Sequence, residues 1–159
     1  MTRLIVGADP GTELTGMVAV TPATSGRVAL VKREMVPSTP SAFLEFLRGL
    51  PMKPDAVAVE RAEGGGFDNY RVKPLLKAQW SGGELGGIAF ALGCTVLRAS
   101  ASVWRKAVIG NLKRGQSYDA LIECALRAYC VDFDAKNTDV NDATGIAYWA
   151  SMKLWRRAA

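Results

Sequence analysis

The chain has 159 residues, with 20 Lys and Arg against 15 Asp and Glu, and it contains no histidine. This length suits one domain with a full hydrophobic core, so we expect residues 1–159 to form a single domain. The modest excess of positive charge suits a polyanionic partner. The longest apolar runs fall far short of the ~20 residues that cross a bilayer, so we expect no membrane insertion.

The cysteines do not form a recognisable disulfide or zinc pattern. Cys94, Cys124 and Cys130 are odd in number and lack CxxC spacing. The first residues also lack the apolar core of a secretory signal. We therefore expect reduced thiols in a cytoplasm. A zinc site would need histidine or more cysteine ligands.

The chain begins with a pattern of three strands. Residues 4–8 are a nearly unbroken apolar run, typical of a central strand buried on both faces. Asp9-Pro10-Gly11-Thr12 then predicts a turn. Residues 15–20 and 27–36 predict two further strands, so these three form an antiparallel meander.

A helix and a fourth strand follow. Thr39 and Pro40 are typical of a helix start, and Pro51 ends that helix. Residues 55–60 predict a strand. We expect it to lie parallel to the first strand, because a helical crossover connects the two.

The second half of the chain is mostly helical. Residues 95–97 predict a fifth strand, and residues 111–116 a basic loop. The helices that we expect around them span residues 72–92, 103–109, 117–129 and 138–155. This order of elements predicts an α/β, ribonuclease H-like fold with a five-stranded mixed sheet flanked by helices.

Four carboxylates stand at the ends of these elements. Asp9 and Glu60 end two neighbouring parallel strands, so we expect them at one sheet edge, about one strand spacing of ~4.8 Å apart. Asp139 and Asp142 are spaced i to i+3 on the last helix and share one face. Carboxylates crowded in this way repel one another unless divalent cations bind them, which favours a magnesium site. Taken singly, each acid also fits a turn, a solvated strand end or a helix N-terminus.

Three motifs together resemble those of the RuvC-type Holliday junction resolvases, and the small size of the chain also fits a phage-type member. They are Ile5-Val6-Gly7-Ala8-Asp9-Pro10-Gly11, the Ala-Val-Glu that ends at Glu60, and Asp139-Val140-Asn141-Asp142-Ala143. The resemblance covers most of the chain. It implies a homodimeric, metal-dependent endonuclease that acts on four-way DNA in a bacterial cytoplasm, or in the host cytoplasm if phage-encoded. It does not identify a partner helicase.

The four carboxylates suggest a mechanism. Two Mg²⁺ ions, which Mn²⁺ should replace, would activate water and stabilise the leaving 3′ oxygen, giving 5′-phosphate and 3′-hydroxyl ends. Our hypothesis makes Asp9 the bridging ligand and places Glu60 and Asp142 on opposite metals. Asp139 would complete the second site or position a water.

Basic and aromatic residues supply candidate DNA contacts. The segment from Leu85 to Tyr118 has no acid, and its Arg98, Arg105, Lys106, Lys113 and Arg114 predict a phosphate-binding track. The loop after Glu60 departs from the resolvase pattern, with Glu63 where those proteins commonly have an aromatic. Phe67 or Tyr70 would stack on unpaired bases instead, or anchor the loop to the core. Arg71 and Lys73 are further candidates.

The helix over residues 72–92 has an unusual number of glycines, in Ser81-Gly82-Gly83 and Gly86-Gly87. Close approach of another helix or of a DNA backbone would explain them, because glycine disfavours a helix interior. Leu75, Trp80 and Leu85 would then belong to a subunit interface or to the core.

Two other functions compete with junction resolution. The same chemistry would suit a nuclease with broader specificity for flaps and forks. A non-catalytic junction-binding protein is a different class, although binding a polyanion does not call for four convergent acids. The Asp-x-Gly turn also resembles the phosphate loop of sugar kinases and actin-like ATPases, but those proteins need a second such domain.

Overall fold

The computed structural model describes residues 3–23, 26–61, 69–113, 115–131, 133 and 137–155, without the side chains of 69–72 and 155. Its elements, in chain order, are β1 (Ile5–Pro10), β2 (Leu14–Pro22), β3 (Val28–Pro37), α1 (Pro40–Arg48), β4 (Ala56–Arg61), α2 (Asn69–Ala91), β5 (Thr95–Ser100), α3 (Ala101–Ile109), α4 (Tyr118–Tyr129), β6 (Cys130–Val131) and α5 (Thr138–Trp155). None of the described helices has the length and apolar character needed to cross a bilayer.

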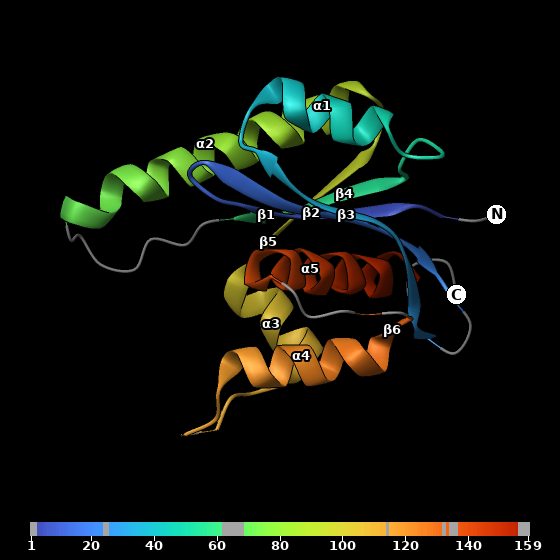
Figure 1. Cartoon of the computed structure of the whole chain (residues 1–159), viewed down its shortest axis with the longest axis vertical. Helices are drawn as coiled ribbons and strands as arrows, with labels where there is room; N and C mark the ends of the chain where they lie inside the picture. The colour runs from blue at the N-terminus through green and yellow to red at the C-terminus, as the bar shows by residue number, and fades with distance from the viewer. Residues whose placement is uncertain are drawn as a thin grey trace.

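The strands form one mixed sheet in the order β5-β4-β1-β2-β3-β6 (Figure 1). As predicted, β1 pairs antiparallel with β2 and parallel with β4. The prediction of five strands was wrong by one, because Cys130–Val131 adds a sixth strand parallel to the start of β3. A strand of two residues is too short to show an alternating pattern in the sequence.

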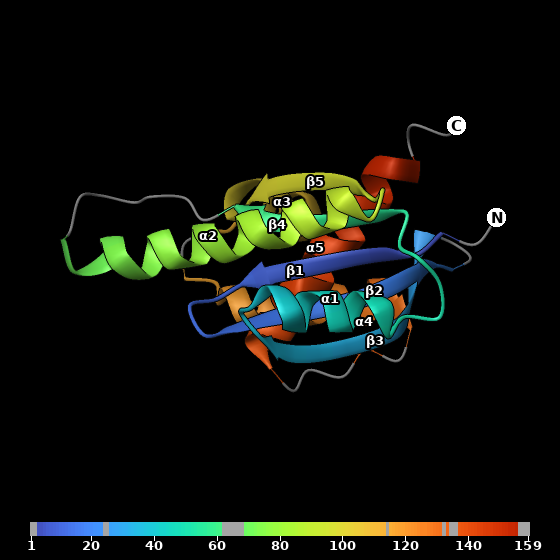
Figure 2. The same cartoon turned by 90° about the horizontal axis from the view of Figure 1, so that it is seen from above.

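Helices cover both faces of the sheet. Figures 1 and 2 show α1 and α2 on one face and α5 on the other, with α3 and α4 packed beneath α5. The first half of α2 extends past the ends of the strands in both views. The local start of α1 follows the sequence prediction, because the Thr39 hydroxyl accepts a hydrogen bond from the Ala42 N–H and Pro40 begins the helix.

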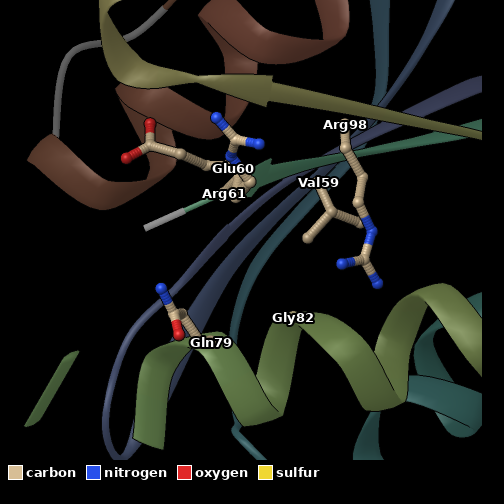
Figure 3. A pocket seen from close by; sticks show the side chains of 6 residues that line it. All are labelled: Val59, Glu60, Arg61, Gln79, Gly82 and Arg98. Carbon is tan, nitrogen blue, oxygen red and sulfur yellow. The ribbon is translucent and has the colours of Figure 1, made fainter. Parts of the chain in front are cut away.

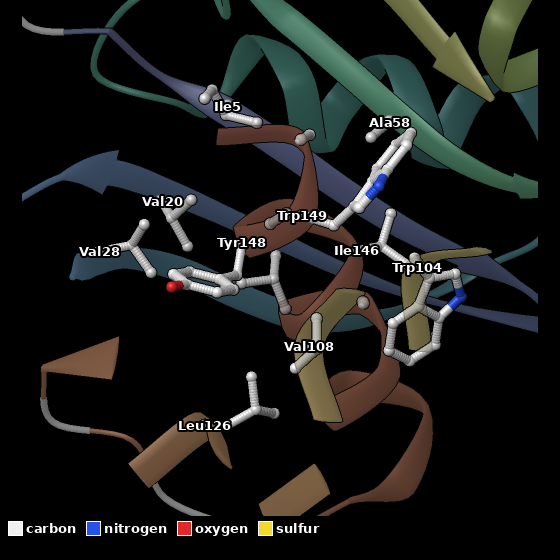
Figure 4. Close-up of a cluster of buried hydrophobic side chains, with 14 of the residues drawn as sticks. Ile5, Val20, Val28, Ala58, Trp104, Val108, Leu126, Ile146, Tyr148 and Trp149 are labelled. Atoms are coloured by element: carbon white, nitrogen blue, oxygen red, sulfur yellow. The ribbon is translucent and has the colours of Figure 1, made fainter. Parts of the chain in front are cut away.

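Each helical layer closes its own hydrophobic core. On the α1 and α2 face, the buried side chains include Phe43, Phe46 and Leu85. On the other face, α5 packs between the sheet and the pair α3 and α4, and the fully buried Trp104 and Ile146 lie there (Figure 4). The sheet is therefore buried on both faces, which explains the nearly unbroken apolar sequence of β1.

Helix α5 lies directly on the backbone of the first two strands. A Cβ added to Gly7 of β1 would lie 2.5 Å from the Ala147 nitrogen. A Cβ added to Gly16 of β2 would lie 2.5 Å from the Asp139 oxygen. Both neighbours are backbone atoms and cannot turn aside. These two glycines thus set the distance between α5 and the sheet.

We expect Gly7→Ala to destabilise the fold by about 1–3 kcal/mol, because the added methyl group forces α5 away from β1. The melting temperature would then fall by roughly 2–4 °C for each kcal/mol of lost stability. Gly49→Ala is the control, since Gly49 lies at the exposed end of α1 with φ of −77° and its nearest neighbours are 3.3 Å away. Equal melting temperatures for the two variants would contradict this packing.

Candidate acidic metal site

Asp9 and Glu60 lie at the same edge of the sheet. Ala8 of β1 pairs with Val59 of β4, so Asp9 and Glu60 are the next residues along two parallel neighbours. The turn after Asp9 is fixed by the hydrogen bond from the Gly11 N–H to the Leu14 oxygen, at 3.0 Å. The Ser38 hydroxyl also donates to the Gly11 oxygen, at 3.1 Å.

The start of α5 brings the other two acids to this edge. The Asn137 side chain accepts hydrogen bonds from the N–H groups of Asp139 and Val140, at 2.8 and 3.2 Å, and so caps the helix. The Asp139 backbone rests on Gly16, and Gly16 is the cross-strand partner of Asp9. Asp142 follows within the first turns of the same helix.

Asp9 has the electrostatic signature of a shared acidic site. Burial first, and then the negative charges of Glu60, Asp142 and Asp139, together raise the pKa of Asp9 to about 8. Arg105 acts in the opposite direction. The Asp9 carboxylate has no hydrogen-bond or ion-pair partner among the described residues. The structure therefore brings the other three predicted acids around Asp9, and no described donor hydrogen-bonds to its carboxylate.

Glu60 is held by a tryptophan. The indole N–H of Trp104, on α3, donates to Glu60 Oε2 at 2.6 Å. Trp104 is fully buried, and its ring fills the space that a side chain at Gly145 of α5 would occupy. The packing of α3 against α5 thus fixes the direction of the Glu60 carboxylate.

Asp142 is held by two donors, one from α3 and one from the start of α4. Arg105 Nη2 donates to Asp142 Oδ2 at 2.8 Å, and the Tyr118 hydroxyl donates to Oδ1 at 2.9 Å. The Arg105 guanidinium also lies 4.2 Å from the Tyr118 ring centre and 5.3 Å from that of Trp104. Burial raises the pKa of Asp142, while the Tyr118 hydrogen bond and the charge of Arg105 limit the rise.

The donor set fits a hard divalent cation. In the described part of the chain, no group of three His, Cys, Asp or Glu side chains has a ready-made metal-binding geometry. Trp104, Arg105 and Tyr118 instead occupy oxygens of Glu60 and Asp142. Asp9, partly buried among other carboxylates without a partner, is the observation that fits a cation, because carboxylate oxygens are the ligands that Mg²⁺ and Mn²⁺ prefer.

The candidate DNA contacts are spread over several elements. Lys73, Lys106 and Lys113 are exposed, on α2, α3 and the loop after α3. Tyr70 and Arg71 lie on α2, where the structure does not describe their side chains, and Phe67 and Arg114 lie outside the described residues. Arg98 pairs in register with Val59, whose side chain packs in the α2 core, so it is separated from Arg105 by the sheet.

Two side chains of the site were not predicted as functional. Neither Trp104 nor Tyr118 was assigned a role from the sequence, because no pattern there indicates a contact with an acid. Helix α2 divides the predicted interface residues: Leu85 is buried in the core, whereas Trp80 is 72% exposed.

Comparison with known proteins gives a fold likeness. No protein-family model and no curated protein matches the sequence. The structure of T. thermophilus RuvC in complex with Holliday junction substrate matches with a TM-score of 0.79 and 20% identity, over 98% of this chain and 96% of that one. Thermus thermophilus RuvC alone gives 0.72 and 20%, over 97% and 96%. The yeast mitochondrial Holliday junction resolvase Ydc2 gives 0.64 and 12%, over 96% and 83%.

These matches confirm the predicted fold class, since the mixed sheet and its flanking helices are those of the ribonuclease H-like RuvC fold. The likeness spans nearly the whole chain.

We expect Asp9→Asn to stabilise the protein at pH 8 in the absence of divalent ions. The folded pKa of Asp9, about 8, lies above the usual unfolded value of ~3.9. The folded state therefore binds more protons between these values, and stability falls as pH rises from about 4 to about 8. The asparagine removes this fall, so its melting temperature at pH 8 should exceed that of the wild type by at least ~2–4 °C. The gain should vanish near pH 4, and an equal or lower melting temperature at pH 8 would contradict the raised pKa.

We expect Trp104→Phe to weaken Mg²⁺ binding by ~10-fold, because Glu60 loses the hydrogen bond that orients it. The measurement is the Mg²⁺ concentration that gives half of the maximal thermal stabilisation. Trp149→Phe is the matched control, because Trp149 is also buried but its indole nitrogen has no hydrogen-bond partner among the described residues. A similar Mg²⁺ dependence for both variants would mean that Trp104 only packs.

Proposed function

We propose that this protein is a divalent-metal-dependent endonuclease that resolves four-way DNA junctions. The observation that carries the proposal is Asp9, which is partly buried, has no partner among the described residues and is repelled by three further acids. This acidic edge lies in a fold shared with a RuvC structure that contains Holliday junction substrate. Four convergent acids suit hydrolysis better than simple binding of a polyanion.

The ligands of this site would be Asp9, Glu60, Asp139 and Asp142. Two bound Mg²⁺ ions, or Mn²⁺ in their place, would activate water and stabilise the leaving 3′ oxygen, giving 5′-phosphate and 3′-hydroxyl ends. Asp9 would serve both ions, because it lies among the other three acids. Trp104 would orient the Glu60 carboxylate through its hydrogen bond to one of the two oxygens.

Arg105 has a second role in this proposal. In this structure it neutralises Asp142 and lies against two aromatic rings. With Asp142 acting as a metal ligand, the Arg105 guanidinium would be placed to bind the scissile phosphate, in keeping with the DNA contact predicted for it. The rings of Trp104 and Tyr118 would limit the movement of the guanidinium, so it would lose little conformational entropy on binding the phosphate.

Further DNA contacts would come from both sides of the edge. Lys106, next to Arg105, and Lys113, in the loop after α3, are exposed, and Arg114 follows Lys113 in the sequence. On the other side, α2 extends past the strands and carries Tyr70, Arg71 and Lys73. Phe67 or Tyr70 would stack on unpaired bases at the junction centre.

The proposed homodimer would use the outer face of α2. Leu76, Trp80 and Phe90 are 56%, 72% and 77% exposed and fall on one helical stripe. Gly83 and Gly87 share that stripe and have nothing within 4 Å of an added Cβ, so another helix could approach closely. Symmetric cleavage of a four-way junction needs two sites related by a two-fold axis, which a dimer supplies.

We expect Asp142→Asn to reduce Mg²⁺-dependent junction cleavage by at least ~100-fold, more than the ~10–100-fold loss typical of residues that only support a ligand. Junction binding should persist. Glu45→Gln, which removes an exposed acid on α1, is the charge-matched control and should cleave normally.

The same assay separates the competing functions. Junction resolution predicts cleavage of a four-way junction well above that of a fork, a flap or a linear duplex. Equal cleavage of all branched substrates would favour the broader debranching nuclease. Tight junction binding by the wild type without cleavage in Mg²⁺ or Mn²⁺ would favour the non-catalytic binding protein.

A further inference from the structure

A pocket opens beside the acidic site, on the opposite face of the sheet. It has a volume of about 320 Å³ and is lined by Val59, Glu60, Arg61, Gln79, Gly82 and Arg98. Figure 3 shows it between α2 and the ends of β4 and β5, with the Arg98 side chain extending from β5 toward α2. No residue of this pocket except Glu60 belongs to the acidic site.

Arg98 gives the pocket its charge. Arg98 has no hydrogen-bond or ion-pair partner among the described residues, although it lies in a pocket rather than on a convex surface. Arg61 follows Glu60 at the end of β4 and adds a second cation to the lining. The Glu60 carboxylate points away from the pocket, because its Oε2 accepts the hydrogen bond from Trp104 on the α3 side. The pocket is therefore a cationic site next to an acidic one.

The glycines of α2 fit this arrangement. A Cβ added to Gly86 would lie 3.0 Å from Arg98 Nη2, so the absence of a side chain there makes room for the guanidinium. A Cβ added to Gly82 would lie 3.3 Å from Pro10 and Val59 and 3.6 Å from the Glu60 oxygen. The floor of the pocket thus adjoins the residue after Asp9 and the backbone of Glu60.

We propose that this pocket binds a backbone phosphate of the cleaved DNA strand, next to the scissile phosphate, and that Arg98 is the residue that binds it. This inference rests on the proposed function. Guanidinium groups bind phosphate through paired hydrogen bonds, which suits Arg98 in this pocket. Gly82 lets α2 pack closely on Pro10 and Val59, and so sets the depth of the pocket.

This placement means that the protein would bind one DNA strand on both sides of the sheet edge. The acids lie on the α5 face, and Arg98 lies on the α2 face. A strand that crosses the edge would place one phosphate at the acids and its neighbour in the pocket. Arg98 would then act as a positioning residue that fixes which phosphodiester bond meets the acids.

The test measures junction binding in an Asp142→Asn background, so that binding is separated from cleavage. We expect Arg98→Ala to weaken junction affinity by about tenfold, as for loss of one charged hydrogen-bonding group. The magnitude of the slope of log affinity against log salt concentration should fall by ~0.9, the value for one phosphate contact. Arg48→Ala is the control, because Arg48 is also exposed but lies at the other end of the sheet, at the end of α1.

A single neutral methylphosphonate linkage, moved along the strand near the cut, locates the contact. We expect a neutral linkage at one position next to the cut to weaken junction binding by the protein that retains Arg98. The same linkage should cause no further loss of binding in the Arg98→Ala variant. Gly86→Ala keeps the charge but displaces the guanidinium, so it should show part of the same loss at the same position.

Two results would overturn the inference: Arg98→Ala binding like Arg48→Ala, or additive effects of the variant and every methylphosphonate. Either result leaves the proposed function intact if the wild type cleaves junctions. A short single strand ending in a 5′-phosphate is a further arm. If it competes for binding at Arg98 and the neutral linkages have no effect, the pocket holds a product phosphate instead of an internal one.

Discussion

The close contact of α5 with the backbone of β1 and β2 is the constraint on which the acidic site depends. Gly7 and Gly16 leave no room for a side chain between the strands and the helix, so the first turn of α5 rests on the partner of Asp9. This contact brings Asp139 and Asp142 to the strand edge where Asp9 and Glu60 end. On the far side of α5, the Trp104 ring fills the space next to Gly145. The position of α5, which is fixed by the sheet on one side and by α3 on the other, therefore determines where the four acids meet.

Bringing four acids together costs electrostatic free energy, and the structure offsets this cost unevenly. Arg105 and Tyr118 hold Asp142, and Trp104 holds Glu60, but no described donor reaches Asp9. Its raised pKa records the remaining repulsion together with burial. A site with this imbalance is prepared for a cation at Asp9. The aromatic rings around Arg105 keep a positive charge nearby, where it would meet the phosphate of a substrate.

The position of the acids at one sheet edge could be predicted because each one lies at an end of an element whose direction follows from simple rules. Parallel strands joined by a helix place Asp9 and Glu60 at one edge, and i to i+3 spacing places Asp139 and Asp142 on one face. The roles of Trp104 and Tyr118 could not be predicted, because they depend on how α3 and α4 pack beneath α5. Arg98 was grouped with Arg105 by nearness in the sequence, yet side chains alternate along β5 and Arg98 faces α2. Strand β6 has only two residues and leaves no sequence pattern.

The sheet edge thus separates two charges, with carboxylates on the α5 face and Arg98 on the α2 face. The account depends first on the four acids forming one shared binding site for divalent cations. Anomalous X-ray scattering from crystals of the wild-type protein grown with Mn²⁺ tests this most directly. We predict Mn²⁺ bound to Asp9 and to at least two of Glu60, Asp139 and Asp142. A site without Mn²⁺ at saturating concentration, with Asp142 still bonded to Arg105, would contradict the account.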